Sequence, residues 1–253
     1  MSISPRQPPQ GPASQESDRL PITELFTSIQ GEGGLVGTPS SFLRVRGCNL
    51  RCGWCDTPQS SWEPTGSLHS LEELVHFCEG GPRHVVLTGG EPLLFPQVAR
   101  LSKALAVQGH HITVETAGTV WCDDLHCDLM SISPKLGHAA PDRGGPSLAA
   151  RHEETRWAPD IVARLSAAFP TQLKFVVRPT PEGLAEDLDE IDEWLAAAGL
   201  TELPAEKVFL MPEGVDPSAL PAAYQLLSTA AHARGYRVGP RLHLTLFGHT
   251  PGT

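Results

Sequence analysis

Apolar residues follow two alternating patterns along this chain, short apolar runs and longer stretches with a helical period. The short runs predict β-strands, and the periodic stretches predict helices that each bury one face. In chain order, strands are expected at 22–29, 41–46, 84–88, 110–115, 127–133, 173–177 and 207–211. Helices are expected at 70–81, 96–109, 160–169, 182–199 and 218–234.

The order of these elements favours an α/β fold. Strands that alternate with helices predict parallel βα units joined by right-handed crossovers. About six such units predict an incomplete (β/α)6 barrel, in which functional residues gather at the carboxyl ends of the strands. Ser70 and Glu73 predict a capping box at the first helix. The acidic run in 182–199 is interpreted as a solvated helix face, and 137–157, which lacks a clear period, as a mobile loop or insertion.

Composition sets the domain organisation and excludes some function classes. Residues 1–20, rich in Pro, Gln and Ser, predict a disordered tail, and residues 21–253 predict one domain. A net charge of −10 disfavours direct nucleic-acid binding, which needs basic surfaces. No apolar run reaches the roughly 18 residues of a membrane span, and the N-terminus lacks the apolar core of a secretory signal. The chain is therefore expected to be cytoplasmic.

Three cysteines crowd the stretch "GCNLRCGWCDT", which follows a predicted strand: Cys48, Cys52 and Cys55. Incidental thiols are the simplest interpretation, but such clustering makes them the weakest. Structural zinc is a second, with His69 or Cys78 as the fourth ligand that zinc usually needs. A four-iron cluster held by three thiolates is a third, and it leaves one iron open to a substrate or cofactor.

The spacing C-x3-C-x2-C resembles the signature of the radical S-adenosylmethionine (SAM) enzymes. "LTGGEP" (87–92), at the end of another predicted strand, resembles the glycine-rich stretch that binds SAM in that superfamily. The resemblance implies that the three cysteines hold a [4Fe–4S] cluster whose open iron binds SAM. It implies catalysis by the radical that forms when an electron from the cluster cleaves SAM.

The chain after residue 20 resembles, more specifically, the 7-carboxy-7-deazaguanine synthase family. "SIQGEG" (28–33), "SPK" (133–135), "LMPEG" (210–214) and "RLHLTLFGHTPGT" (241–253) carry this resemblance. It implies a lyase of queuosine-precursor (7-deazapurine) biosynthesis that converts 6-carboxy-5,6,7,8-tetrahydropterin to 7-carboxy-7-deazaguanine and ammonia. It also implies a reduced barrel of the radical SAM type, a homodimer, an electron-donating protein partner and Mg²⁺.

Each expected binding residue is carried over from matching motifs. The resemblance implies a SAM site formed by Trp54, Cys55, Asp56, Gly90, Ser133, Pro134, Lys135, Leu210, Met211, Pro212 and Glu213. It implies a pterin site formed by Ile29, Gln30, Gly31, Arg44, Thr88 and Thr253, with Arg44 paired to the substrate carboxylate. Thr57 is implied as the Mg²⁺ ligand. From the residues alone, Arg44 could equally be an exposed strand arginine and Thr57 a turn cap.

Two alternative functions stay open at this point. A radical SAM activase that forms a glycyl radical on a partner protein would share the cysteine spacing. A non-enzymatic zinc module would need only the thiols. Cys78 falls on the apolar face of a predicted helix and is interpreted as a core thiol. Cys122 and Cys127 are interpreted as ordinary thiols, because auxiliary-cluster ligands would be more numerous.

Overall fold

Nine strands form one continuous sheet in the computed structural model, which describes residues 18–253. The strands are β1 (Arg19–Ile29), β2 (Pro39–Val45), β3 (Ser67–Ser70), β4 (His84–Gly89), β5 (His111–Thr116), β6 (Leu129–Ile132), β7 (Thr171–Val177), β8 (Val208–Pro212) and β9 (Arg237–Val238). Their order across the sheet is β3-β1-β2-β4-β5-β6-β7-β8-β9. β1 runs antiparallel to β2 and β3, and all other neighbours are parallel.

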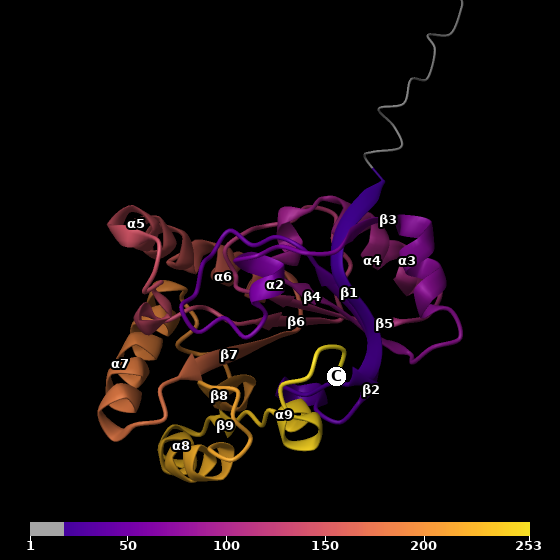
Figure 1. The fold of residues 1–253 in the computed structure, drawn as a ribbon. Helices are drawn as coiled ribbons and strands as arrows, with labels where there is room; N and C mark the ends of the chain where they lie inside the picture. The colour runs from indigo at the N-terminus through magenta and orange to yellow at the C-terminus, as the bar shows by residue number, and fades with distance from the viewer. Residues whose placement is uncertain (1–17) are drawn as a thin grey trace, which may run out of the picture.

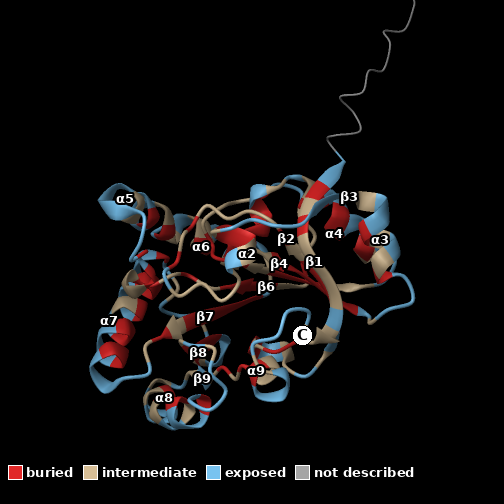
Figure 2. Ribbon diagram, viewed as in Figure 1, coloured by how far each residue is buried: buried red, intermediate tan, exposed pale blue. Residues whose placement is uncertain are grey.

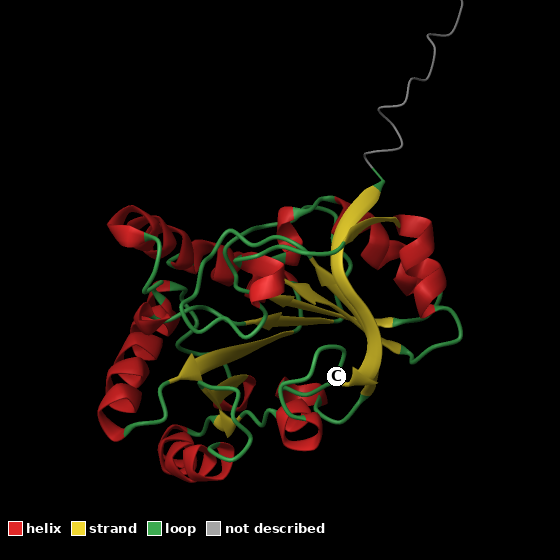
Figure 3. Cartoon of the chain, viewed as in Figure 1, coloured by secondary structure: helices red, strands yellow, loops and turns green. Residues whose placement is uncertain are grey.

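The sheet curves but does not close, because its two edge strands do not pair with each other (Figure 1). This confirms the predicted α/β fold and incomplete barrel. The helices lie around the sheet (Figure 3). They are α2 (Pro58–Ser61), α3 (Leu71–Cys78), α4 (Gln97–Val107), α5 (Gly145–Arg156), α6 (Pro159–Ala168), α7 (Pro181–Ala197), α8 (Leu220–Arg234) and α9 (Leu242–Phe247). Short 3₁₀ turns include η1 (Gly33–Leu35), η2 (Pro92–Leu94), η3 (Gly137–Ala139) and η4 (Ala205–Lys207).

Buried residues concentrate in the strands and on the inward faces of the helices (Figure 2). Central parallel strands are covered on both faces, which is why β4 reads as a continuous apolar run in the sequence. α3 begins with the predicted capping box: Glu73 N donates to Ser70 Oγ (3.2 Å), and Ser70 N donates to the Glu73 carboxylate (2.8 Å). A smaller core lies beside the main one and includes Leu50, Cys52 and Ala117.

Two predictions about helices were wrong. Residues 137–157 are not a loop: they contain η3 and α5. The apolar period failed there because α5 buries His152 and Arg156 instead of an apolar stripe. The acidic run on α7 is not wholly solvated either, since Asp187 is 1% exposed and pairs with Arg178 (2.7 Å).

Short elements escaped the sequence patterns. β3, β9 and α9 have too few residues to establish a period, and the packing of neighbouring elements determines them. Most of the expected tail, 1–20, lies outside the described residues. Within it, β1 already begins at Arg19. Among the helices of residues 18–253, none is long and apolar enough to cross a membrane.

Candidate active site

A cavity of about 640 Å³ opens at the carboxyl ends of the parallel strands, which is where the barrel prediction expected the site. A volume of this size suits a small-molecule ligand or cofactor. Its walls come from the cysteine loop (48–57), the ends of β4, β5 and β6, the β1–β2 connection and the C-terminal segment. The expected site residues that line it are Ile29, Gln30, Gly31, Arg44, Cys48, Cys52, Trp54, Cys55, Asp56, Thr57, Thr88, Gly90, Ser133, Lys135, Met211 and Thr253.

Four expected SAM-site residues do not line this cavity: Pro134, Leu210, Pro212 and Glu213. The Leu210 side chain is fully buried in the main core, and its carbonyl accepts a hydrogen bond from Gly239 N (2.8 Å). The Glu213 carboxylate lies 3.4 Å from the His138 ring. A role in cofactor binding for these four residues therefore stays a prediction.

The cysteine loop directly follows β2 and is held by contacts from distant parts of the chain. Trp62 Nε1 donates to Cys52 O (2.9 Å), and Gly53 N donates to Ala139 O (3.0 Å). Gly47 N donates to Ser60 O (2.8 Å). The three thiols therefore sit on a fixed backbone instead of a free loop.

The thiols of the cysteine loop can serve as ligands of an iron–sulfur cluster. Burial raises the pKa of Cys48 to about 12 and that of Cys52 to about 11, so both need a cation to become thiolates. Within residues 18–253, no three His, Cys, Asp or Glu side chains converge tightly enough to hold a single metal ion. A cubane takes one thiolate at each of three corners and needs no such convergence. Three thiolates at the corners of a cubane are therefore compatible with this loop.

The double glycine of "LTGGEP" has a packing role that the sequence did not reveal. A Cβ on Gly90 would lie 2.1 Å from Gly47 O and 2.9 Å from Cys48 Cβ, so only glycine lets β4 end against the cysteine loop. Glu91 follows with no exposed surface. Its carboxylate accepts hydrogen bonds from Thr116 Oγ1 (2.8 Å) and Ala117 N (2.8 Å), which tie β4 to the end of β5.

Trp54 and Lys135 lie together at the loop side of the cavity. The Lys135 ammonium is 5.8 Å from the Trp54 ring centroid and donates to Ser133 O and Oγ, both at 2.8 Å. Trp54 Nε1 is buried and has no hydrogen-bond partner within the described chain. An aromatic face, a cation and an unused N–H beside the thiols suit a cofactor that carries both a flat ring and a carboxylate.

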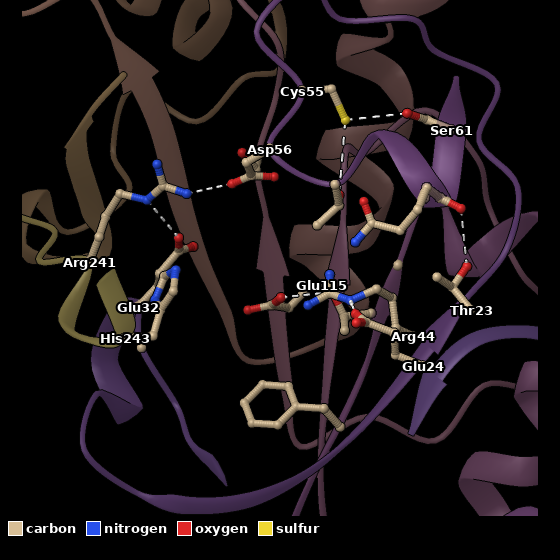
Figure 4. Close-up of a pocket in the computed structure, with 18 of the residues that line it drawn as sticks. Thr23, Glu24, Glu32, Arg44, Cys55, Asp56, Ser61, Glu115, Arg241 and His243 are labelled. Atoms are coloured by element: carbon tan, nitrogen blue, oxygen red, sulfur yellow. Dashed lines mark hydrogen bonds and ion pairs between the residues drawn. The ribbon is translucent and has the colours of Figure 1, made fainter. Parts of the chain in front are cut away.

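Arg44 points into the other side of the cavity from β2 (Figure 4). Its Nε donates to Glu24 (2.8 Å), and its guanidinium lies 5.6 Å from the Phe26 ring centroid. The side chain is 17% exposed, so the alternative of a freely exposed strand arginine is wrong.

Gln30 and Thr88 both support a carboxylate that the sequence analysis did not single out. Gln30 Nε2 donates to Glu115 (3.0 Å), and Thr88 Oγ1 donates to its other oxygen (2.9 Å). Gly31 N donates to the Gln30 amide oxygen (3.0 Å). Both the nitrogen and the oxygen of the Gln30 amide are therefore hydrogen-bonded within the protein. Gln30 holds the Glu115 carboxylate in place, and Glu115 lines the cavity.

Charged side chains surround Glu115: Lys174 and Arg241 are buried, and Glu32 is partly buried. Lys174 on β7 donates to Glu32 (2.9 Å) and to Glu115 (3.2 Å) and is 3% exposed. Burial by itself would raise the pKa of Glu32, but Lys174 and Arg241 bring it well below its usual range. Burial likewise opposes the charge of Lys174, and the two carboxylates raise its pKa above its usual range. We refer to Glu32, Glu115, Lys174 and Arg241 as the charged network.

Arg241 joins this network to the cysteine loop (Figure 4). Its guanidinium bonds to Glu32 (3.2 Å), to Asp56 and to Gly214 O (2.5 Å). Tyr224 of α8 accepts its backbone N–H (2.7 Å). One side chain therefore bonds to the β1–β2 connection, the cysteine loop and the loop after β8.

Thr57 stands beside the cysteine loop with an available hydroxyl. It is the N-cap residue of α2, but its side chain makes no capping hydrogen bond. Its hydroxyl lies 3.9 Å from Cys55 Sγ. The turn-cap alternative is therefore wrong for its side chain.

The remaining cysteines lie in the main core, as expected of ordinary thiols. Cys78, Cys122 and Cys127 are all buried and free. Burial raises the pKa of Cys78 and of Cys127 to about 12. Such thiols are inert.

Comparison with known proteins agrees with this geometry. The Radical SAM superfamily matches residues 43–136, which include the cysteine loop and "LTGGEP". A 7-carboxy-7-deazaguanine synthase of Rhodopirellula baltica is 43% identical over 246 residues, 96% of this chain and 92% of the relative. One of Halobacterium salinarum is 42% identical over 262 residues, 96% of this chain and 100% of the relative. The chain belongs to the 7-carboxy-7-deazaguanine synthase family.

The fold agrees with that family as well. The crystal structure of QueE from Escherichia coli superposes with a TM-score of 0.62 at 27% identity, and the match covers 90% of this chain and 96% of that one. The barrel is therefore of the radical SAM type, as predicted. The superfamily implies a [4Fe–4S] cluster and SAM, and the donor set of the cysteine loop fits both.

Proposed function

We propose that this protein converts 6-carboxy-5,6,7,8-tetrahydropterin to 7-carboxy-7-deazaguanine with loss of ammonia, a step of queuosine-precursor biosynthesis. One observation carries the proposal: the three cysteines and every expected pterin-binding residue line the same cavity. Relatives of matching length bear the name of this activity. That name disfavours both the activase and the zinc module.

Cys48, Cys52 and Cys55 would hold the cluster by one thiolate each. When bound, the cluster and SAM supply the radical that begins the reaction. Trp54, Lys135 and Ser133 line the cavity beside the thiols, so we assign the cofactor to this side. The Trp54 ring offers a face for a flat base, and Lys135 offers a cation for a carboxylate.

The opposite side suits a pterin. Its ring edge presents adjacent N–H donors, and Glu115, fixed by Gln30, Thr88 and Lys174, presents carboxylate oxygens to them. Arg44 would pair with the substrate carboxylate. Its Nε donates to Glu24, and within residues 18–253 its two terminal nitrogens make no hydrogen bond, so both can donate to a carboxylate. Thr253 lines the same side.

We assign Mg²⁺ to Thr57. Magnesium keeps several waters and needs few protein ligands, so one threonine oxygen together with substrate oxygens suffices. Thr57 lines the cavity and its hydroxyl makes no capping bond, which supports this assignment.

The deciding experiment is anaerobic turnover. The reconstituted protein is mixed with SAM, a reductant, Mg²⁺ and the carboxytetrahydropterin, and the products are identified by mass. We expect 7-carboxy-7-deazaguanine and one ammonia per turnover. Reconstituted protein that consumes no pterin under these conditions would refute the proposal.

The partners and location expected from the sequence remain part of the proposal. A radical SAM enzyme needs an electron-donating partner, and the family resemblance of the sequence implies a homodimer. Six free cysteines suit the reducing conditions of a cytoplasm.

A further inference from the structure

Residues 137–157, in which the sequence shows no clear period, pack directly against the cysteine loop. The smaller core joins them, since Ala139 is fully buried there with Leu50, Cys52 and Ala117. Gly53 N donates to Ala139 O (3.0 Å). A Cβ at Gly53 would lie only 3.1 Å from Ala140 O, so the two backbones meet closely.

α5 contributes a more specific contact. Arg51 N, between the first and second cysteines, donates to His152 Nδ1 at 3.1 Å. His152 is 2% exposed, and burial lowers its pKa, which keeps the ring neutral and Nδ1 able to accept. The other ring nitrogen, Nε2, is buried with no hydrogen-bond partner in the described part of the chain. A buried nitrogen without a partner costs free energy. The hydrogen bond from Arg51 N is therefore the interaction that explains why a histidine is buried at this position.

Two aromatic contacts join the same segment to the loop. The His138 ring stacks on Trp54 with centroids 5.8 Å apart. The Arg143 guanidinium lies 4.0 Å from the centroid of Trp62, whose Nε1 bonds to Cys52 O. His138, Ala139, Ala140, Arg143 and His152 of the segment thus contact the loop or the tryptophan that supports it.

The segment is itself anchored to α7. Arg156 bonds to Glu190 (2.6 Å), and the same carboxylate accepts from Gly137 N (2.8 Å). His138 lies 3.2 Å from the buried Asp187. Both ends of the segment are therefore tied to a long helix that packs on the sheet, which gives the loop contacts a rigid base.

We propose that residues 137–157 clamp the cysteine loop in its cluster-binding shape, and that His152 is the positioning residue that fixes the Arg51 amide. The proposal rests on the cluster assignment given above. A loop that must present three thiolates at fixed corners loses conformational entropy when it binds, and a clamp reduces that loss in advance. Release of the clamp therefore weakens cluster retention without removal of any ligand.

The test follows iron loss from the full-length protein after anaerobic reconstitution, with a coloured chelator in excess. We expect His152→Ala to lose iron about fivefold faster than wild type, as the loss of one hydrogen bond predicts. His152→Asn places an oxygen near the position of Nδ1 and should restore most of the retention. Glu154→Ala, an exposed change on the same helix, should behave as wild type.

A second measurement separates a local clamp from general destabilisation. Hydrogen exchange of the cluster-free protein should show faster exchange of amides 51–53 in His152→Ala, with the amides of β7 unchanged. Equal loss of protection in both regions, or no change in either exchange or iron retention, would overturn the proposal. If His152→Ala does not fold, Arg143→Ala removes an exposed guanidinium from Trp62 and should give the same two changes in smaller degree.

Failure of the clamp and failure of the proposed function give different results. Wild-type protein that binds no iron would refute the cluster assignment, whereas the exchange of amides 51–53 would still test the clamp. Protein that turns over the pterin while His152→Ala matches wild type in exchange and iron retention would refute the clamp alone.

Discussion

The two sides of the cavity differ in how their polar groups are satisfied. In the charged network every member is paired with opposite charge: Lys174 with Glu32 and Glu115, and Arg241 with Glu32. Beside the cysteine loop, Cys48 and Cys52 are thiols with raised pKa values, and Trp54 Nε1 has no partner among the described residues. The charges of the network are paired within the protein, and Glu115 keeps acceptor capacity for a ligand, whereas the thiols and the indole N–H lack partners of opposite charge within residues 18–253.

The largest effect should come from breaking the loop side. Cys52→Ala removes one cluster corner, so turnover should be abolished and bound iron should fall sharply. Turnover and iron content are measured on the same anaerobic preparation. Cys78→Ala is the matched control, because that thiol lies in the main core and should leave the cluster in place. Loss of all iron in Cys78→Ala would contradict the assignment of three ligands.

The network side should respond through stability. Lys174→Met leaves two partly buried carboxylates, 17% and 22% exposed, without their shared cation, which should cost about 3 kcal/mol of unfolding free energy. Urea unfolding at neutral pH measures this loss. Lys103→Met is the control: its pair with Asp124 is exposed, so the cost should stay below about 1 kcal/mol. Similar losses in both variants would show that the network does not differ from a surface pair.

Lys174→Met should also change how the unfolding free energy depends on pH. In wild type the pKa values of Glu32 and Glu115 are lowered, so their contribution is present above their ordinary pKa of 4.5 and is lost as pH falls through the folded values. The raised pKa of Lys174 makes its contribution present below its ordinary value of 10.5 and lost as pH rises through the folded value.

Without Lys174, burial should raise the Glu115 pKa above its ordinary value, since burial is the largest influence on it. A raised carboxyl pKa gives stability that is present at low pH and is lost as pH rises. The loss of unfolding free energy in Lys174→Met, relative to wild type, should therefore be largest near neutral pH and should shrink toward pH 5. Urea curves at several pH values would contradict this if the loss grew on acidification.

The two sides also differ in how far the sequence could predict them. Cys48, Cys52, Trp54 and Cys55 lie within one short loop, so their spacing indicated a metal site and carried the family resemblance that implied the cluster. The charged network is assembled from positions 32, 115, 174 and 241, which only the sheet and the C-terminal segment bring together. Each of these residues, taken alone, reads as an ordinary charged residue. The α/β order was predictable for the same reason as the loop, because each strand and helix has its own local period.

Arg44 allows the pterin side to be tested apart from the cofactor side. Arg44→Ala should weaken substrate binding by about 2–5 kcal/mol and leave SAM binding nearly unchanged, because the lost partner is a carboxylate in a largely enclosed site. Arg44→Lys should recover only part, since an ammonium lacks the guanidinium fork. Binding constants for both ligands are measured under anaerobic conditions. Arg46→Ala, whose side chain bonds to Gly66 O outside the cavity, is the control.

The smallest effect is expected at Thr57, between the two sides. Thr57→Ala removes no capping hydrogen bond, so the unfolding free energy should change by less than about 0.5 kcal/mol. Thr180 is the matched contrast, because its side chain accepts from Gly183 N (3.2 Å) at the start of α7. Thr180→Ala should cost about 1 kcal/mol and leave the magnesium dependence unchanged.

If Thr57 is a magnesium ligand, its loss should appear in the metal titration and not in stability. The magnesium concentration for half-maximal turnover should rise in Thr57→Ala, while iron content and SAM affinity stay as in wild type. Thr57→Ser keeps the oxygen and should keep most of the activity. Turnover is titrated with magnesium for the three proteins. Superimposable curves for wild type and Thr57→Ala would exclude the ligand role. The titration is a clean test, because Thr57 makes no side-chain cap whose loss could disturb the site.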